Sequence, residues 1–356
     1  MTLSSRRIDV HHHLIPPAFK AGMERRGITQ VAGAPMPGWT PERSTAVMSR
    51  NGIETAILSL SSPGVYFGDL AEARDLARAC NDYSAELVAR DPTRFGMFAV
   101  LPMPFTEPAC AEAIRALDVL KADGIVLLGS TEGVFLGDSR LEELMTELDR
   151  RRATVFLHPN LHETSKQLDL SLPGFLIEFL CDTTRAATNL IVSGTIERHP
   201  NISWILAHSG GFLPYIAWRL SLSNLMAETA AAMPQGFLHY AKSFYYDTAL
   251  SPGRYSLAAL KELVDPTHIL FGSDFPFAPE VMTNMQCREL EDTDLIDATA
   301  ARMVARQNAL TLFPRFADNN ESPSPQRTAR SATMRDRLGA VARSPMLRLA
   351  ERIRQR

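Results

Sequence analysis

Ile8-Asp9-Val10-His11-His12-His13 holds three of the chain's nine histidines, at the end of a short apolar run. Successive side chains of a β-strand point to opposite faces. His11 and His13 therefore share one face, and we expect His12 to point the other way, toward the helices outside the strand. Two imidazoles on one face, two residues apart, make half of a metal site. The other half must come from elsewhere in the chain.

Short runs rich in Val, Ile, Leu and Phe recur along the chain and alternate with helical stretches. The predicted strands are 8–13, 54–62, 95–102, 124–130, 154–158, 203–208, 244–250 and 269–274. The predicted helices begin near Thr40-Pro41-Glu42 and continue with 71–90, 108–120, 139–151, 175–198, 214–226, 257–264 and 295–312. Near-continuous apolar strands are typical of a parallel sheet that is buried on both faces. Eight such units predict an α/β fold of the closed (β/α)8 TIM barrel type. No GxGxxG or GxxxxGK[ST] motif favours an open nucleotide-binding sheet.

The sequence predicts two regions, a barrel over residues 1–316 and a basic tail over 317–356. The tail holds nine Arg and four acidic residues, a balance of +5, whereas the whole chain carries −3. Its start, 319–325, is rich in Pro, Ser and Asn and is typical of a linker. We expect a flexible tail, with an arm that packs on a second subunit as the alternative. Within the barrel, 16–39 is expected to form a loop over the site.

Composition excludes several classes of function. With 45% hydrophobic and 22% charged residues and a net charge of −3, bulk charge points to neither nucleic acid nor a membrane surface. No apolar run reaches the ~20 residues that span a bilayer. Residues 1–7 contain no apolar signal-peptide core, so we expect a cytoplasmic protein. The four cysteines form no CxxC pair and are expected to be reduced thiols.

Polar residues stand at the ends of four predicted strands. These residues are His11, His13, His158, His208 and Asp274. The active site of a TIM barrel lies where the carboxyl ends of its strands meet, so these side chains are expected to converge. Their convergence predicts a metal site. Three neutral imidazoles and one carboxylate suit Zn²⁺, with Mn²⁺, Fe²⁺ or Co²⁺ as alternatives, and leave a position open for water or substrate.

Four motifs in this order resemble the amidohydrolase superfamily. They are His11-x-His13, Phe156-Leu157-His158-Pro159, Ala207-His208-Ser209-Gly210-Gly211 and Phe271-Gly272-Ser273-Asp274-Phe275-Pro276-Phe277. The resemblance extends from about residue 8 to residue 313. It is closest to the decarboxylase-rich branch that includes aminocarboxymuconate semialdehyde decarboxylase and 6-methylsalicylate decarboxylase. Some hydroxybenzoate decarboxylases of this branch carry Glu in place of the first His of the HxH pair, so His11 favours the other two groups.

The resemblance implies roles for individual residues of the barrel. The metal ligands are implied to be His11, His13, His158 and Asp274, with His208 as the catalytic histidine. Two-metal members of the superfamily carry a bridging lysine at strand four, where this chain has Leu127-Leu128-Gly129-Ser130 and no lysine. One divalent metal ion is therefore expected, with Zn²⁺ favoured and Mn²⁺ as the alternative.

Two further residues have alternative interpretations. Arg219 follows the strand-six histidine, where aminocarboxymuconate enzymes carry an arginine that binds a substrate carboxylate across a dimer interface. The resemblance thus implies substrate binding by Arg219 and a homodimer; the alternative is a surface arginine in an ion pair. Asp247, on the seventh strand, either orients a metal ligand or caps the turn that follows.

The reaction implied is non-oxidative, metal-dependent decarboxylation of a small aromatic or unsaturated carboxylic acid. Carbon dioxide leaves when the carbon it vacates accepts a proton, and Asp274 or His208 is expected to deliver that proton. A hydrolase of a lactone, amide or ester would use the same residues and is the alternative function. A barrel that has lost catalysis is disfavoured, because every expected ligand position is filled.

Overall fold

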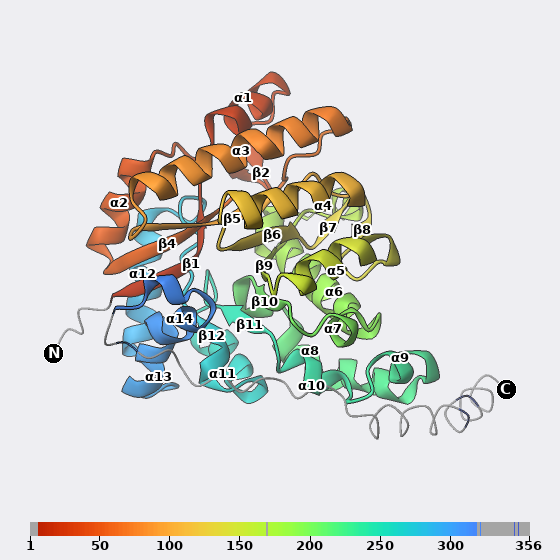
Figure 1. The fold of residues 1–356 in the computed structure, drawn as a ribbon. Coiled ribbons are helices and arrows are strands. Elements are labelled where there is room, and N and C mark those ends of the chain that lie inside the picture. Colours follow the sequence, from red (N-terminus) through yellow and green to blue (C-terminus); the bar gives the residue numbers. More distant parts are fainter. Residues whose placement is uncertain (1–5, 169, 319–320, 322–344, 346–347, 349–356) are drawn as a thin grey trace.

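The computed structural model describes residues 6–168, 170–318, 321, 345 and 348. Its centre is one sheet of eight parallel strands that follow each other in chain order, with helices around it (Figure 1). The strands are β1 (Arg7–His13), β4 (Ile53–Ser59), β5 (Phe95–Val100), β6 (Gly124–Leu128), β9 (Thr154–His158), β10 (Ser203–Leu206), β11 (Tyr245–Asp247) and β12 (Ile269–Leu270). The predicted (β/α)8 barrel is confirmed.

The barrel closes between its first and last strands. The Val10 amide donates to the Phe271 carbonyl over 3.0 Å, and the His13 amide donates to the Phe275 carbonyl over 2.7 Å. His12 and Phe275 form a parallel bridge beyond the end of β12. The segment after β12 therefore continues the sheet on to β1 and lies directly beside the histidine triplet.

Helices cover the outside of the sheet. They are α2 (Pro41–Arg50), α3 (Leu70–Arg90), α4 (Thr106–Ile114), α5 (Glu142–Arg150), α6 (Glu178–Val192), α7 (Thr195–Arg198), α8 (Leu213–Ser221), α9 (Ala227–Ala232), α10 (Phe237–Ala241), α11 (Arg254–Leu263), α12 (Glu280–Asp292), α13 (Ala298–Arg302) and α14 (Asn308–Leu312). Wider π-helical turns extend α4 over Arg115–Val119 and join α13 to α14 over Met303–Gln307. The side chains of the strands alternate between these helices and the barrel interior.

The helices differ from the prediction in two places. The helix predicted over 175–198 begins at Glu178 and is broken between α6 and α7, because Gly194 adopts a left-handed conformation with φ 75°. The helix α12 was not predicted. Its buried face contains Thr283 and Gln286 beside Cys287 and Leu290, so its apolar periodicity is weak.

The expected loop over 16–39 is partly regular. It contains α1 (Pro17–Arg25) and a hairpin of β2 (Gln30–Val31) with β3 (Ala34–Pro35). Val31 and Ala34 of this hairpin line a chamber above the strand ends. A second hairpin, β7 (Ser130–Thr131) with β8 (Val134–Phe135), follows β6.

The interior of the barrel is filled by aromatic side chains below the site. Phe98 and Phe156 stack at 5.4 Å between ring centroids, and Phe156 meets the His11 ring edge-on at 4.8 Å. Phe156 and His158 are two residues apart on β9 and so point to the same, inner face. Apolar side chains of the barrel interior therefore pack against the histidines.

The first acidic residues of the predicted tail contact the barrel. Of the predicted tail, Asp318 bonds Arg6 over 2.5 Å and Glu321 bonds Arg306 over 2.8 Å, so both are held on the barrel. The rest of the predicted tail lies outside the described residues, apart from residues 317, 345 and 348. No helix in the described part of the chain is long and apolar enough to cross a membrane.

Candidate metal centre and active site

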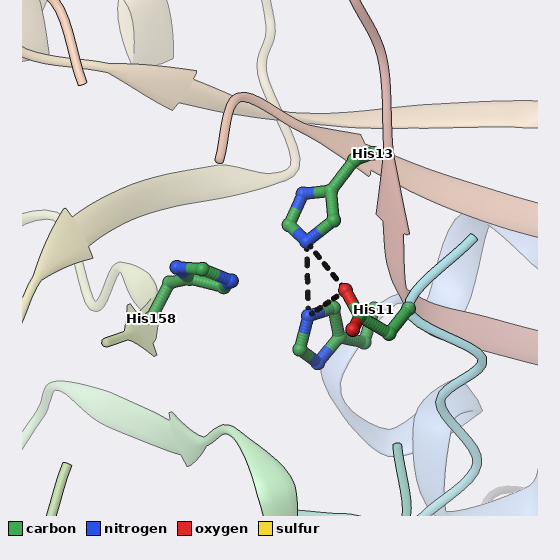
Figure 2. Close-up of side chains that lie close together, drawn as sticks. His11, His13 and His158 are labelled. Atoms are coloured by element: carbon green, nitrogen blue, oxygen red, sulfur yellow. Dashed lines mark hydrogen bonds and ion pairs between the residues drawn. The ribbon is translucent and has the colours of Figure 1, made fainter. Parts of the chain in front are cut away.

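Four buried side chains from three parts of the barrel meet at the carboxyl ends of the strands. Their donor atoms, from His11, His13, His158 and Asp274, all lie within 4.8 Å of one another. The His11 and His13 Nε2 atoms are 3.0 Å apart, and Asp274 Oδ1 lies 3.3 Å and 3.1 Å from them. Figure 2 shows the three imidazole rings around one centre. The predicted set of ligands is thus brought together, although its residues span more than 260 positions in sequence.

The second nitrogen of each ring is occupied by an acceptor. His158 Nδ1 donates to the Pro159 carbonyl over 2.8 Å, and His208 Nδ1 donates to the Ala249 carbonyl over 3.0 Å. His13 Nδ1 lies 3.1 Å from the Ser59 carbonyl and 3.1 Å from the Ser59 hydroxyl, whose oxygen can also accept. A carbonyl can only accept, so these Nδ1 atoms carry the hydrogen and the Nε2 atoms keep a free lone pair. A free Nε2 is the form of imidazole that binds a metal ion.

Asp247 connects the two sides of the site. Its Oδ2 accepts from His11 Nδ1 over 2.7 Å, while Oδ1 accepts from the His208 and Ala249 amides, each over 2.9 Å. This carboxylate is completely buried. Both interpretations left open by the sequence therefore hold in the geometry, because Asp247 orients the His11 ring and also caps the turn after β11.

The backbone presents His208 and Asp274 in an uncommon conformation. His208 has φ 54° and Asp274 has φ 59°, both in the left-handed region that non-glycine residues rarely adopt. After His208, the chain turns at Gly211 (φ 64°), where a Cβ atom would lie 2.3 Å from the Leu180 carbonyl. Both side chains thus leave the strand direction and face the chamber.

The electrostatics of the cluster suit a cation. Burial lowers the pKa of His13, His158 and His208, so these rings are neutral at neutral pH. Burial also opposes charge on His11, but the Asp247 and Asp274 carboxylates outweigh it and raise its pKa to about 10. Burial raises the pKa of Asp274, but hydrogen bonds from His11 and His13 dominate and hold it well below its usual range. The carboxylates therefore favour positive charge at the centre of the cluster, which a divalent ion would supply.

A chamber of about 310 Å³ opens above this cluster. His208 and Asp274 lie at its floor, and Ser61 and Ser251 are its other polar residues. Its remaining walls are apolar, formed by Val31, Ala34, Phe175, Leu176, Phe179, Leu180, Leu250, Phe277 and Met282. Such a chamber fits the flat apolar body of a small ligand whose polar end faces the histidines.

Two of the residues considered in the sequence, Arg219 and His12, lie outside the cluster. Arg219 is exposed on α8, does not line the chamber, and forms no ion pair among the described residues. His12 points away from the cluster as expected, and its Nε2 lies 2.9 Å from the Ser44 hydroxyl on α2.

Sequence reasoning missed Asp9 and Ser273, which bond each other in the segments just before His11 and Asp274. A carboxylate within an apolar strand, two residues before His11, is the signal that could have revealed Asp9.

Comparison with known families agrees with this geometry. The model of the amidohydrolase family matches residues 8–315. The chain belongs to the amidohydrolase family. Apart from Arg7 of β1, this match includes all eight strands, and it includes all four candidate ligands.

Relatives of this amidohydrolase include fungal decarboxylases. The decarboxylase yanB of Aspergillus niger is 40% identical over 324 residues, which cover 87% of this chain and 88% of that protein. The 6-methylsalicylic acid decarboxylase of Penicillium expansum is 35% identical over 318 residues, covering 87% of this chain and 97% of that protein.

Solved amidohydrolase structures share the fold. A structure described as amidohydrolase II has a TM-score of 0.81 at 33% identity and covers 86% of this chain and 99% of its own. The dihydroxybenzoic acid decarboxylase of Polaromonas sp. JS666, solved with bound manganese and 2-nitroresorcinol, has a TM-score of 0.76 at 25% identity. That comparison covers 88% of this chain and 98% of the other.

Proposed function

We propose that this amidohydrolase is a metal-dependent, non-oxidative decarboxylase of a small aromatic carboxylic acid. One divalent ion would be held by His11, His13, His158 and Asp274, whose donor atoms already lie within 4.8 Å of one another. The absence of a lysine at the end of β6 supports one ion in preference to two. When bound, the ion would attract the substrate's carboxylate and a neighbouring hydroxyl and stabilise the negative charge that develops.

The observation that carries this proposal is the chamber. His208 and Asp274 line it together with two serines, Ser61 and Ser251, and its other lining residues are apolar, Phe179 and Phe277 among them. An aromatic acid satisfies both ends, because its ring is buried among apolar side chains while its carboxylate faces the candidate metal site. The decarboxylases among the relatives support decarboxylation over hydrolysis of a lactone, amide or ester.

His208 and Asp274 are proposed to handle the proton. The bond between the ring and the carboxylate carbon breaks, its electron pair stays on the ring carbon, and that carbon takes up a proton as carbon dioxide leaves. The lowered pKa values of both residues make each of them a base at rest. Either must therefore accept a proton before it can deliver one to the ring carbon.

The identity of the ion is proposed as Zn²⁺, with Mn²⁺ as the alternative. Imidazole nitrogens and carboxylate oxygens are among the ligands that zinc takes in proteins. Manganese occurs in the related Polaromonas decarboxylase. Elemental analysis of protein purified without added metal, followed by reconstitution with each ion separately, distinguishes the two.

We further propose that α8 packs against a second copy of the chain. Tyr215 and Trp218 are 84% and 74% exposed, and Leu222 and Leu225 extend the same apolar stripe at helical spacing. Arg219 lies beside this stripe and does not line its own chamber, so it would bind substrate in the partner's site. A Trp218→Asp variant that remains dimeric by light scattering would contradict this arrangement.

A cytoplasmic location completes the proposal. All four cysteines are free thiols, three of them buried, which is usual in a reducing compartment. Fractionation of the native host, with immunodetection of the chain, tests this location.

The function is tested by supplying purified, metal-loaded protein with a panel of hydroxylated benzoic acids, among them 6-methylsalicylic acid, and with aryl lactones and esters. We expect carbon dioxide from at least one acid, formed in equal amount to the decarboxylated arene. Ring opening or ester cleavage without carbon dioxide would refute decarboxylation.

A further inference from the structure

A buried polar network connects β1 with α2 and with the segment that follows β12. Its centre is the Asp9 carboxylate, which is fully buried. Asp9 Oδ1 accepts from the amides of His11 over 3.1 Å and Ser273 over 3.0 Å. Asp9 Oδ2 accepts from the Ser273 hydroxyl over 2.5 Å and lies 3.0 Å from His12 Nδ1. The carboxylate thus has four partners, two of which belong to the segment just before Asp274.

The direction of the hydrogen bonds in this network follows from its outer end. Trp39 Nε1 can only donate, and it donates to the Ser44 hydroxyl over 2.8 Å. The Ser44 hydrogen is then free to be donated to His12 Nε2, 2.9 Å away. Since the Asp9 carboxylate can only accept, His12 carries its hydrogen on Nδ1 and donates it to Asp9, which leaves Nε2 to accept from Ser44. The chain of donors runs from α2 through His12 to the Asp9 carboxylate.

The network reaches the candidate site through Ser273. Strand β12 ends at Leu270, so Asp274 is not held by a regular strand ladder. Instead, the Asp274 amide donates to the His11 carbonyl over 2.8 Å, and the Phe275 amide donates to the Ser273 hydroxyl over 3.1 Å. These bonds fix the left-handed conformation of Asp274, φ 59°, that aims its carboxylate at His11 and His13.

We propose that Asp9, His12 and Ser273 are positioning residues that hold Asp274 in place for the metal ion. This inference rests on the proposed metal site but not on the proposed reaction. The middle histidine of the triplet thereby acquires a role: it acts on the opposite face of β1 from His11 and His13, through Asp9 and Ser273. Partners one layer behind a ligand typically change metal affinity about 10–100-fold.

Two substitutions of His12 separate positioning from packing. In His12→Asn, the side-chain amide can occupy the place of Nδ1 and still donate to Asp9. In His12→Gln, it occupies the place of Nε2, keeps Ser44 and loses Asp9. The metal-free protein is titrated with Zn²⁺ or Mn²⁺ against a competing chelator, and folding is checked by circular dichroism. We expect about a 10–100-fold loss of metal affinity in His12→Gln and a clearly smaller loss in His12→Asn.

The serine provides a second, smaller substitution and a matched control. Ser273→Ala removes the hydroxyl and is expected to weaken metal binding, whereas Ser273→Thr retains the hydroxyl and should restore it. The control is Ser84→Ala, because Ser84 is also a buried serine but its hydroxyl bonds, among the described residues, only the Cys80 carbonyl within α3. Wild-type metal affinity in folded Ser273→Ala, or an equal loss in Ser84→Ala, would overturn the inference. The proposed reaction fails separately, as a wild-type protein that binds metal but releases no carbon dioxide.

Discussion

Substitution of Asp247 by asparagine tests how the site sets the form of its histidines. The carboxylate accepts three hydrogen bonds, from His11 Nδ1 over 2.7 Å and from the amides of His208 and Ala249 over 2.9 Å each. An amide has one acceptor oxygen in place of two. If that oxygen keeps the two backbone amides, its NH₂ group meets the hydrogen on His11 Nδ1. A metal ion at Nε2 leaves the hydrogen of His11 on Nδ1, where this NH₂ group opposes it, so metal binding is weakened.

The magnitude follows from the bonds that are lost. A hydrogen bond to a charged group contributes about 1.5–3 kcal/mol, and at least one is lost in Asp247→Asn. Because about 1.4 kcal/mol corresponds to a factor of ten, we expect metal affinity to fall at least about tenfold. The measurement is chelator competition on metal-free protein, together with carbon dioxide release at saturating metal.

A matched control is available at the opposite end of the barrel. Asp123 precedes β6 and accepts from the Met97 amide over 2.9 Å and from Arg315, so Asp123→Asn also removes a carboxylate that accepts a backbone amide. It is expected to lower stability and leave metal affinity unchanged. Equal metal affinity in Asp247→Asn and wild type would refute the argument that Asp247 fixes the His11 tautomer.

Three further outcomes are expected. His158→Ala removes a candidate donor atom itself, so metal affinity should fall by more than the ~100-fold that is typical of losing a residue behind a ligand. Elemental analysis should therefore find less bound metal, and normal metal content would exclude His158 as a ligand. Burial raises the pKa of Asp182 to about 6 from an ordinary 3.8, so the folded state holds its proton more tightly than the unfolded state, and this contribution to stability is lost as pH rises from about 4 to 6. Urea titrations should show about 3 kcal/mol of this dependence in wild type and none of it in Asp182→Asn; an unchanged pH dependence would contradict the raised pKa. Gly211→Ala should destabilise the protein by more than about 1 kcal/mol, because Gly211 has a positive φ and lies close to the Leu180 carbonyl. A variant that unfolds at the same urea concentration as wild type would show that the turn tolerates a side chain.

The barrel and its candidate ligands were predictable because their signals are local. Each strand is a short apolar run, and His13, His158 and Asp274 each stand at or just beyond the end of such a run. In a parallel barrel those ends necessarily meet at one mouth. The helix α12 gave no comparable signal, since polar Thr283 and Gln286 occupy its buried face.

The residues that orient the ligands were harder to predict, because their partners are distant in sequence. Asp247 lies 236 residues from His11, and Ser273 lies 264 residues from Asp9. Only the closed barrel brings these pairs together, across the junction of the last strands with β1. For Arg219, the sequence offered two interpretations, and a single copy of the chain places it on the surface, away from its own chamber.

The most direct test of the central claim follows one acid through turnover in heavy water. Metal-loaded protein is given the preferred acid, labelled with ¹³C at the carboxylate, and the products are identified by NMR. The proposed function predicts one labelled carbon dioxide for each acid consumed, deuterium at the vacated ring carbon, and no reaction in metal-stripped protein. Persistence of carbon dioxide release after complete removal of the metal, or a product that retains the labelled carboxylate, would contradict it.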